Sequence, residues 1–211
     1  MFTDYDSLIT HIRALGLKSP SFNQELLWLF QQAFNASHCF PDKNILELGT
    51  LNAISACVMA CGVAKITCES PSRDIDAKVI SVDNYHVYGV HGDANADVKS
   101  YEQNIQLVQD LEYGGVVELV RSDDIAFLSD VPDGSLSMLS VDSWHDYDHV
   151  LETLSIAIPK MCINALICGH DYALGNNGVV YAVEEWKEEN RKHLCGFGTH
   201  YRNWWTLVRP V

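Results

Sequence analysis

The chain has 211 residues, 47% of them hydrophobic, which is enough for one sizeable core and requires no second domain. Its formal net charge is −14, so it lacks the excess of Lys and Arg that a surface for nucleic acid or anionic membrane needs. We therefore expect one domain over residues 1–211 that acts on a small molecule, with no nucleic-acid partner and no membrane partner.

The cysteines and the N-terminus indicate the compartment. Seven cysteines are an odd number, and several lie in apolar stretches, namely Cys57, Cys61, Cys162 and Cys168. This pattern is typical of reduced thiols rather than of a disulfide framework. The N-terminus is acidic, and no apolar run reaches the roughly 20 residues of a membrane span. We expect a cytoplasmic protein, and the sequence leaves homo-oligomerisation open.

Residues 1–42 are predicted to form helices ahead of the core. The first helix, residues 5–15, stops at Gly16, and Ser21 can cap a second helix. The second helix has an apolar stripe that consists of Leu26, Leu29, Phe30 and Phe34. We expect these helices to cover one edge of a sheet.

From residue 43 onward, strands and helices alternate. The predicted strands are residues 44–48, 79–82, 116–120, 136–141 and 163–167, followed by a closing pair near 200–208. The predicted helices are residues 51–61, which stop at Gly62, and residues 100–111, 149–161 and 179–192. Such alternation predicts a Rossmann-like, doubly wound α/β fold with a mostly parallel seven-stranded sheet and helices on both faces.

Two stretches interrupt the alternation. Residues 65–77 are interpreted as a surface insertion. Residues 84–98 directly follow the predicted strand 79–82, so they fit a binding loop and a surface insertion equally well.

The first predicted strand leads into a turn that could hold a ligand. Gly49 is followed by small residues, which would let a ligand lie against the backbone at a helix N-terminus. Asp83 closes the next predicted strand, where a carboxylate can accept hydrogen bonds from ribose hydroxyls. A tight strand-to-helix turn and a simple capping role for Asp83 explain the same residues without a ligand.

Two further clusters close the strands at 136–141 and 163–167. Asp142 and His145 follow the first strand, and His170 and Asp171 follow the second. Because ligands of open α/β sheets bind at the carboxyl ends of strands, we expect these four side chains to converge there. Taken singly, each has a structural alternative: Asp142 as a helix cap, His145 as a surface residue, and residues 169–172 as a plain turn.

In combination, these motifs resemble the class I S-adenosylmethionine-dependent methyltransferases, in particular the macrocin-type branch of small-molecule O-methyltransferases. The resemblance covers about residues 26–208. It rests on Glu47-Leu48-Gly49-Thr50 with Ser55, on Val82-Asp83, and on Asp142-x-x-His145-x-Tyr147 with Gly169-His170-Asp171-Tyr172. The chain departs from the family at Ala53, where a second glycine is usual, and at His170-Asp171, where adjacent aspartates can occur.

The resemblance implies roles for the cofactor-binding residues. The loop with Glu47, Gly49, Thr50 and Ser55 would hold the methionine part of S-adenosylmethionine. By the same resemblance, Asp83 would hold the ribose. The resemblance also places Ser122 and Asp123 at the adenine edge, although N-capping of the following helix explains this pair about as well.

The resemblance also implies an acceptor site. Asp142 and Asp171 would share Mg²⁺ or another divalent metal that lowers the pKa of an acceptor hydroxyl. His145 would be the base, since an unperturbed imidazole pKa of about 6.5 suits proton transfer at neutral pH. His170 is a further catalytic candidate, as a support or an alternative ligand. The sequence does not identify the acceptor.

Three other functions are compatible with the sequence. A methyltransferase-like binding protein without turnover would explain Ala53. A nicotinamide-dependent oxidoreductase would use the same strand, turn and acid, but the glycine spacing of the dinucleotide motif is missing. A metal-dependent hydrolase would use the cluster Asp142, His145, His170 and Asp171.

Overall fold

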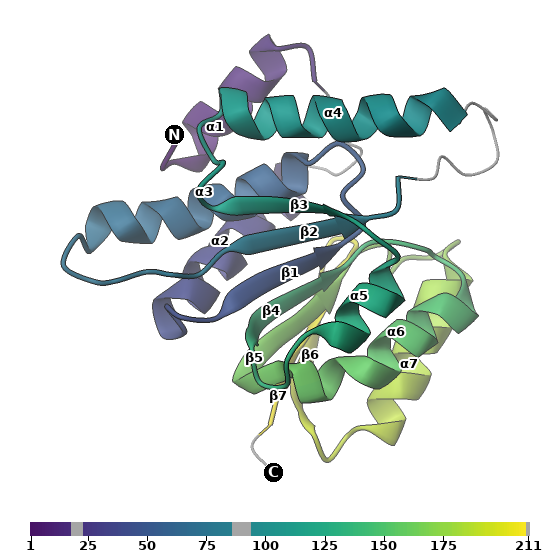
Figure 1. Cartoon of the computed structure of the whole chain (residues 1–211). Coiled ribbons are helices and arrows are strands. Elements are labelled where there is room, and N and C mark those ends of the chain that lie inside the picture. Colours follow the sequence, from purple (N-terminus) through teal and green to yellow (C-terminus); the bar gives the residue numbers. More distant parts are fainter. Residues whose placement is uncertain (18–22, 86–93, 210–211) are drawn as a thin grey trace.

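The computed structural model describes residues 1–17, 23–85 and 94–209, of which residues 94–100 are described by their backbone alone. One sheet runs through the molecule in the order β3-β2-β1-β4-β5-β7-β6 (Figure 1). Its strands are β1 (Asn44–Leu48), β2 (Val79–Asp83), β3 (Val117–Arg121), β4 (Leu136–Val141), β5 (Met161–Gly169), β6 (Leu194–His200) and β7 (Asn203–Val208). The expected Rossmann-like fold with a seven-stranded, mostly parallel sheet is confirmed.

Helices alternate with the strands along the chain. They are α1 (Tyr5–Ala14), α2 (Asn23–Cys39), α3 (Ile54–Glu69), α4 (Ala94–Asp110), α5 (Asp124–Asp130), α6 (Tyr147–Lys160) and α7 (Asn177–Glu189). Capping carboxylates fix several starts: Asp4 accepts from the Ser7 N–H before α1, and Asp146 accepts from the His149 N–H before α6. The cap of α6 is therefore Asp146, which leaves Asp142 free of that role.

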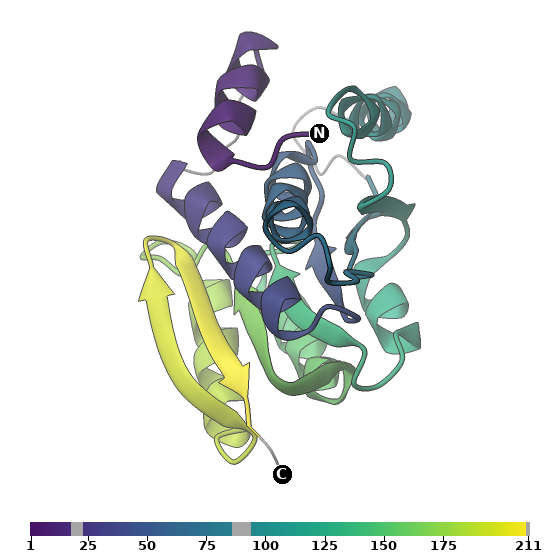
Figure 2. The same ribbon diagram turned by 90° about the vertical axis from the view of Figure 1, so that its left-hand side faces the viewer.

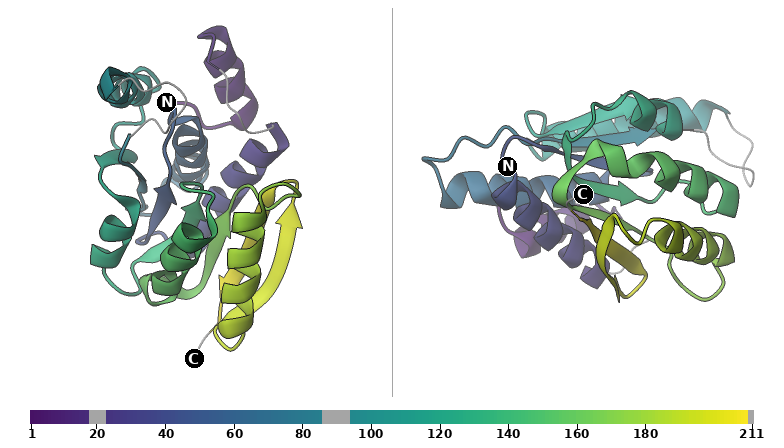
Figure 3. Two further views of the ribbon diagram at one scale, coloured as in Figure 1. Left: turned by 90° about the vertical axis from the view of Figure 1, so that its right-hand side faces the viewer. Right: turned by 90° about the horizontal axis from the view of Figure 1, so that it is seen from below.

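The sheet separates two hydrophobic cores. Helices α1 to α4 cover one face, and α5 to α7 cover the other (Figures 2 and 3). Successive residues of each central strand belong to opposite cores; in β1, Ile45 lies in one core and Leu46 in the other. Both faces of β1 and β4 are consequently buried, without a break from Ile45 to Leu48 and from Leu136 to Val141.

The last hairpin brings a distant turn to the carboxyl end of the sheet. Strand β7 runs antiparallel to β5, with Gly169 opposite Trp204. The turn between β6 and β7, residues 201–202, therefore lies beside the residues that follow β5. The Tyr172 N–H donates to the Arg202 carbonyl at 2.9 Å and links the two segments.

The structure differs from the prediction in the ends of two helices and in the position of α2. Helix α3 continues through Gly62 to Glu69, because Gly62 allows α2 to approach: a Cβ there would lie 2.5 Å from the Phe30 carbonyl oxygen. The supposed insertion at 65–77 thus starts as helix. Helix α4 begins at Ala94, inside the predicted loop 84–98. Helix α2 packs on a face of the sheet rather than on an edge, and Ser21 lies outside the described residues.

The seven cysteines are all free thiols, as expected. Cys57, Cys61 and Cys168 are buried, and Cys162 is half-buried. Within the residues that the structure describes, none of the helices has the length and apolar character to cross a bilayer.

Candidate active site

The turn after β1 is built from backbone that favours glycine. Gly49 has φ = 98°, and a Cβ there would lie 2.2 Å from the Asp142 carbonyl oxygen. Leu51 and Ala53 also have positive φ, at 44° and 54°. A glycine at position 53 would adopt this conformation without strain. For the buried Ala53 the left-handed conformation costs on the order of 1 kcal/mol.

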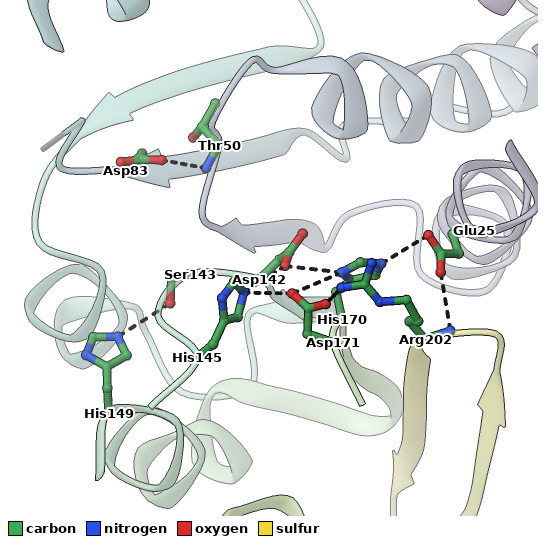
Figure 4. Close-up of polar contacts among 10 residues, drawn as sticks. All are labelled: Glu25, Thr50, Asp83, Asp142, Ser143, His145, His149, His170, Asp171 and Arg202. Carbon is green, nitrogen blue, oxygen red and sulfur yellow. Dashed lines mark hydrogen bonds and ion pairs between the residues drawn. The ribbon is translucent and has the colours of Figure 1, made fainter. Parts of the chain in front are cut away.

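The carboxylate of Asp83 fastens this turn to β2. Its Oδ2 accepts from the Thr50 N–H at 3.0 Å (Figure 4) and from the Leu51 N–H at 3.1 Å, while its Oδ1 accepts from the Tyr85 N–H at 2.6 Å. A carboxylate offers about four acceptor positions, so three backbone donors do not exhaust it. Asp83 both shapes the turn and keeps acceptor capacity on its exposed side.

Glu47 lies beneath the turn, within the core. It belongs to a polar row across the sheet, in which the paired residues are Ser81, Glu47, Ser140 and Cys168. The Ser81 hydroxyl donates to Glu47 Oε2 at 2.5 Å, and Thr50 Oγ1 lies 2.8 Å from Ser81 Oγ. Burial raises the pKa of Glu47 to about 8, against hydrogen bonds from Ser55 and Ser81 that lower it. Glu47 and Ser55 thus support the turn from below.

The segment after β3 carries a helix cap and an ion pair. Asp123 caps α5 by accepting from the Ala126 N–H at 2.9 Å, and the Ser122 N–H donates to the Asp83 carbonyl at 3.1 Å. Asp124 Oδ2 lies 2.8 Å from His149 Nε2, a contact that was not predicted. Burial alone would lower the pKa of His149, but the hydrogen bond and charge of Asp124 raise it. The capping alternative for Asp123 is thus realised, and the backbone of the preceding Ser122 contacts Asp83 at the end of β2.

The four residues predicted to converge do so (Figure 4). His145 Nε2 lies 3.0 Å from Asp171 Oδ2 and 3.6 Å from Asp142 Oδ1. His170 Nδ1 lies 3.5 Å from Asp171 Oδ2 and 3.7 Å from Asp142 Oδ1. Asp171 is buried at φ = 58°, a left-handed conformation that Asp tolerates, while about half of the His145 side chain is exposed.

Two residues of this cluster were not predicted. Glu25 of α2 is fully buried, with its Oε2 3.1 Å from His170 Nε2, and Arg202 forms an ion pair with Asp171 Oδ1. Glu25 lies on the same helical stripe as Leu29, and an acid on an apolar stripe was the signal available in the sequence. Arg202 gave no such signal, because only the β7 pairing places it here.

Close packing holds the cluster in place. Gly178 of α7 lies against the backbone before α6, where an added Cβ would be 2.4 Å from the His145 carbonyl oxygen. Gly169 lies under Trp204, with a virtual Cβ 2.6 Å from Trp204 Nε1. Both contacts require glycine and fix the segments that carry His145 and His170.

The cluster suits a divalent cation. One ligand atom from each of Asp142, His170 and Asp171 can be chosen so that all lie within 4.8 Å of one another. The donor set is two carboxylate oxygens and one imidazole nitrogen, which suits ions such as Mn²⁺ at least as well as the strictly oxygen-seeking Mg²⁺. Arg202 already neutralises one oxygen of Asp171 and leaves Oδ2 facing the site.

The sheet order, the glycine turn after β1 and the acids after β2 and β4 define the class of Rossmann-like methyltransferases. The family described as "Methyltransferase domain" matches residues 46–172, and the chain belongs to this family. No curated protein sequence gives a significant match.

Solved structures share the fold at low sequence identity. The O-methyltransferase from Bacillus cereus in complex with SAH has a TM-score of 0.64 and 12% identity, with 97% of this chain and 90% of that chain covered. The O-methyltransferase NovP has a TM-score of 0.68 and 15% identity, with 89% and 81% covered. TomG from Streptomyces achromogenes, an O-methyltransferase of tomaymycin synthesis in complex with SAM, has a TM-score of 0.65 and 13% identity, with 100% and 92% covered.

Proposed function

We propose that this protein transfers a methyl group from S-adenosylmethionine to a hydroxyl oxygen of a small molecule. The observation that carries the proposal is the contact between Gly49 and the backbone of Asp142. Because of this contact, the turn suited to the cofactor borders directly on the acid–histidine cluster suited to the acceptor. The family membership and the SAH- or SAM-bound structures of similar fold support the same function.

S-adenosylmethionine supplies a methyl group on a positively charged sulfonium. Gly49 and Thr50 would present bare backbone to its methionine part, and Asp83 would accept from the ribose hydroxyls with its remaining lone pairs. Ser122 and Asp123 would border the adenine. Glu47 and Ser55 would act indirectly, since Glu47 is only 1% exposed and Ser55 bonds to it beneath the turn.

Asp142, Asp171 and His170 would hold a divalent metal at the acceptor site. A metal there lowers the pKa of a hydroxyl bound to it. His145, half exposed and 3.0 Å from Asp171, would accept the acceptor's proton while the rigid cluster aligns the oxygen with the methyl group. The charge of −14 favours a free small molecule over a nucleic acid as the acceptor.

We also propose that residues 1–211 act as one domain. Helix α2 belongs to the predicted N-terminal helical part, yet its Glu25 contacts His170 at the carboxyl end of β5. Helix α2 therefore contributes to the site, which supports one domain.

The test is calorimetric titration with S-adenosylmethionine and S-adenosylhomocysteine, with and without Mg²⁺, and with NAD as the control ligand. We expect saturable binding of both adenosyl ligands and none of NAD. Binding of NAD alone would indicate an oxidoreductase. Metal binding without adenosyl binding would indicate a hydrolase, and neither would indicate a binding protein that has lost the cofactor through Ala53.

A further inference from the structure

Glu25 is a buried carboxylate whose two oxygens are both engaged at the acceptor site. It is fully buried in the first turn of α2. Its Oε2 lies 3.1 Å from His170 Nε2, and its Oε1 accepts from the Arg202 N–H at 3.3 Å (Figure 4).

The contact with Glu25 determines how His170 is oriented. A carboxylate can only accept hydrogen bonds, so the ring nitrogen that faces it must carry the proton. A neutral His170 then has its proton on Nε2 and a lone pair on Nδ1. That lone pair faces the carboxylates of Asp171 and Asp142 at 3.5 and 3.7 Å. Three acceptors directed at one point form a site for a cation.

Glu25 also reaches the second ligand, through Arg202. The N–H that Glu25 binds belongs to the same residue whose guanidinium pairs with Asp171 Oδ1. With Oδ1 occupied in this way, Oδ2 is the oxygen of Asp171 that faces His145 and His170. One carboxylate on α2 thereby contacts both His170 and the residue that pairs with Asp171.

We propose that Glu25 is a positioning residue that holds His170 in its Nε2–H tautomer and so makes Nδ1 a metal ligand. This inference rests on the metal site of the proposed function and specifies which nitrogen of His170 binds the metal. A carboxylate behind a metal-binding histidine fixes the tautomer and ring orientation, and its loss typically weakens metal binding by roughly 10- to 100-fold.

The first test is Mn²⁺ affinity, measured from the EPR signal of free Mn²⁺ in the absence of cofactor. Glu25→Gln should bind Mn²⁺ roughly 10- to 100-fold more weakly than wild type. The amide has only one oxygen, so its NH₂ group must face either His170 Nε2 or the Arg202 N–H and cannot accept a hydrogen bond there. The control is Glu69→Gln, which removes an exposed carboxylate paired with Lys65 at 3.1 Å. Unchanged Mn²⁺ affinity in folded Glu25→Gln, or no Mn²⁺ binding by the wild type, would overturn the proposal.

A double-mutant cycle separates positioning from a general structural role. If Glu25 acts through His170, Glu25→Gln should weaken Mn²⁺ binding little further in a His170→Asn background. Additive losses would overturn the proposal. Affinity for S-adenosylhomocysteine should stay unchanged in Glu25→Gln, so a loss of both ligands would indicate general disruption of the fold and count against a positioning role.

A measurement that needs no Glu25 variant remains decisive even where that variant does not fold. Long-range ¹H–¹⁵N spectra of ¹⁵N-histidine-labelled protein with Mg²⁺ bound report which ring nitrogen carries the proton, and His170→Asn assigns the signal. We expect protonated Nε2 and unprotonated Nδ1 for His170. Protonated Nδ1 would overturn the inference. Absence of adenosyl binding would overturn the methyltransferase proposal and leave this inference intact.

Discussion

The raised pKa of the buried Glu47 predicts how the free energy of unfolding depends on pH. Its pKa is raised from 4.5 to about 8 by burial, whereas in the unfolded chain the carboxyl keeps its ordinary value. Between these values the folded protein holds a proton that the unfolded chain has released. Raising the pH through this window therefore favours unfolding, and stability falls as the pH increases.

The magnitude follows from the two pKa values. One differential proton is worth about 1.4 kcal/mol per pH unit, so the window from 4.5 to about 8 corresponds to a loss on the order of 5 kcal/mol. Glu47→Gln is neutral at every pH and nearly isosteric. Relative to this variant, the wild-type free energy of unfolding should fall by roughly 4 kcal/mol between pH 5 and pH 8.

The assay is urea unfolding of both proteins at pH 5, 6, 7 and 8, followed by tryptophan fluorescence. Any fixed cost of the Gln amide near Ser55 and Ser81 shifts all four points equally and leaves the slope intact. Glu118→Gln, which changes an exposed carboxylate on β3, is the control and should track the wild type. A difference between wild type and Glu47→Gln that is constant with pH would refute the argument that Glu47 is protonated in the folded state.

Three further substitutions probe the proposed site. Asp142→Ala should lower methyl transfer by roughly 10²- to 10⁴-fold with the unfolding transition nearly unchanged; wild-type turnover with an identified acceptor would rule out its catalytic role. Asp83→Ala should weaken S-adenosylhomocysteine binding roughly 10- to 100-fold in calorimetry, and an unchanged affinity would remove the ribose assignment. Gly49→Ala places a methyl group 2.2 Å from the Asp142 carbonyl oxygen and should cost roughly 2 to 4 kcal/mol in urea unfolding; wild-type stability would contradict the close approach of the two segments.

The local pattern of the sequence was sufficient for the fold class and for most of the cluster. Apolar runs at 136–141 and 163–167 predicted β4 and β5, because strands buried on both faces need no polar alternation. The polar residues after β4 and β5 were predicted to meet because parallel strands end at the same edge of the sheet. His145 and Asp171 indeed lie 3.0 Å apart. This step needed only the order of the elements.

Helix packing determined the length of α3 and the position of α2, which the local sequence pattern predicted wrongly. Gly62 reads as a helix stop, yet α3 continues because Gly62 admits the backbone of α2 at close range. Tertiary contact thus outweighed the low helix propensity of glycine. Packed against α3 in this way, α2 covers a face of the sheet instead of an edge.

The sequence by itself determined the alternation of strands and helices, and with it the strand ends where Asp83, Asp142 and Asp171 lie. Only the tertiary structure brought Glu25 and Arg202 to His170 and Asp171. Glu25 is 145 residues from His170 along the chain, and no short-range pattern encodes such a contact. It arises because α2 packs across the sheet and β7 inserts antiparallel beside β5, and both arrangements depend on burying apolar faces contributed by the whole chain.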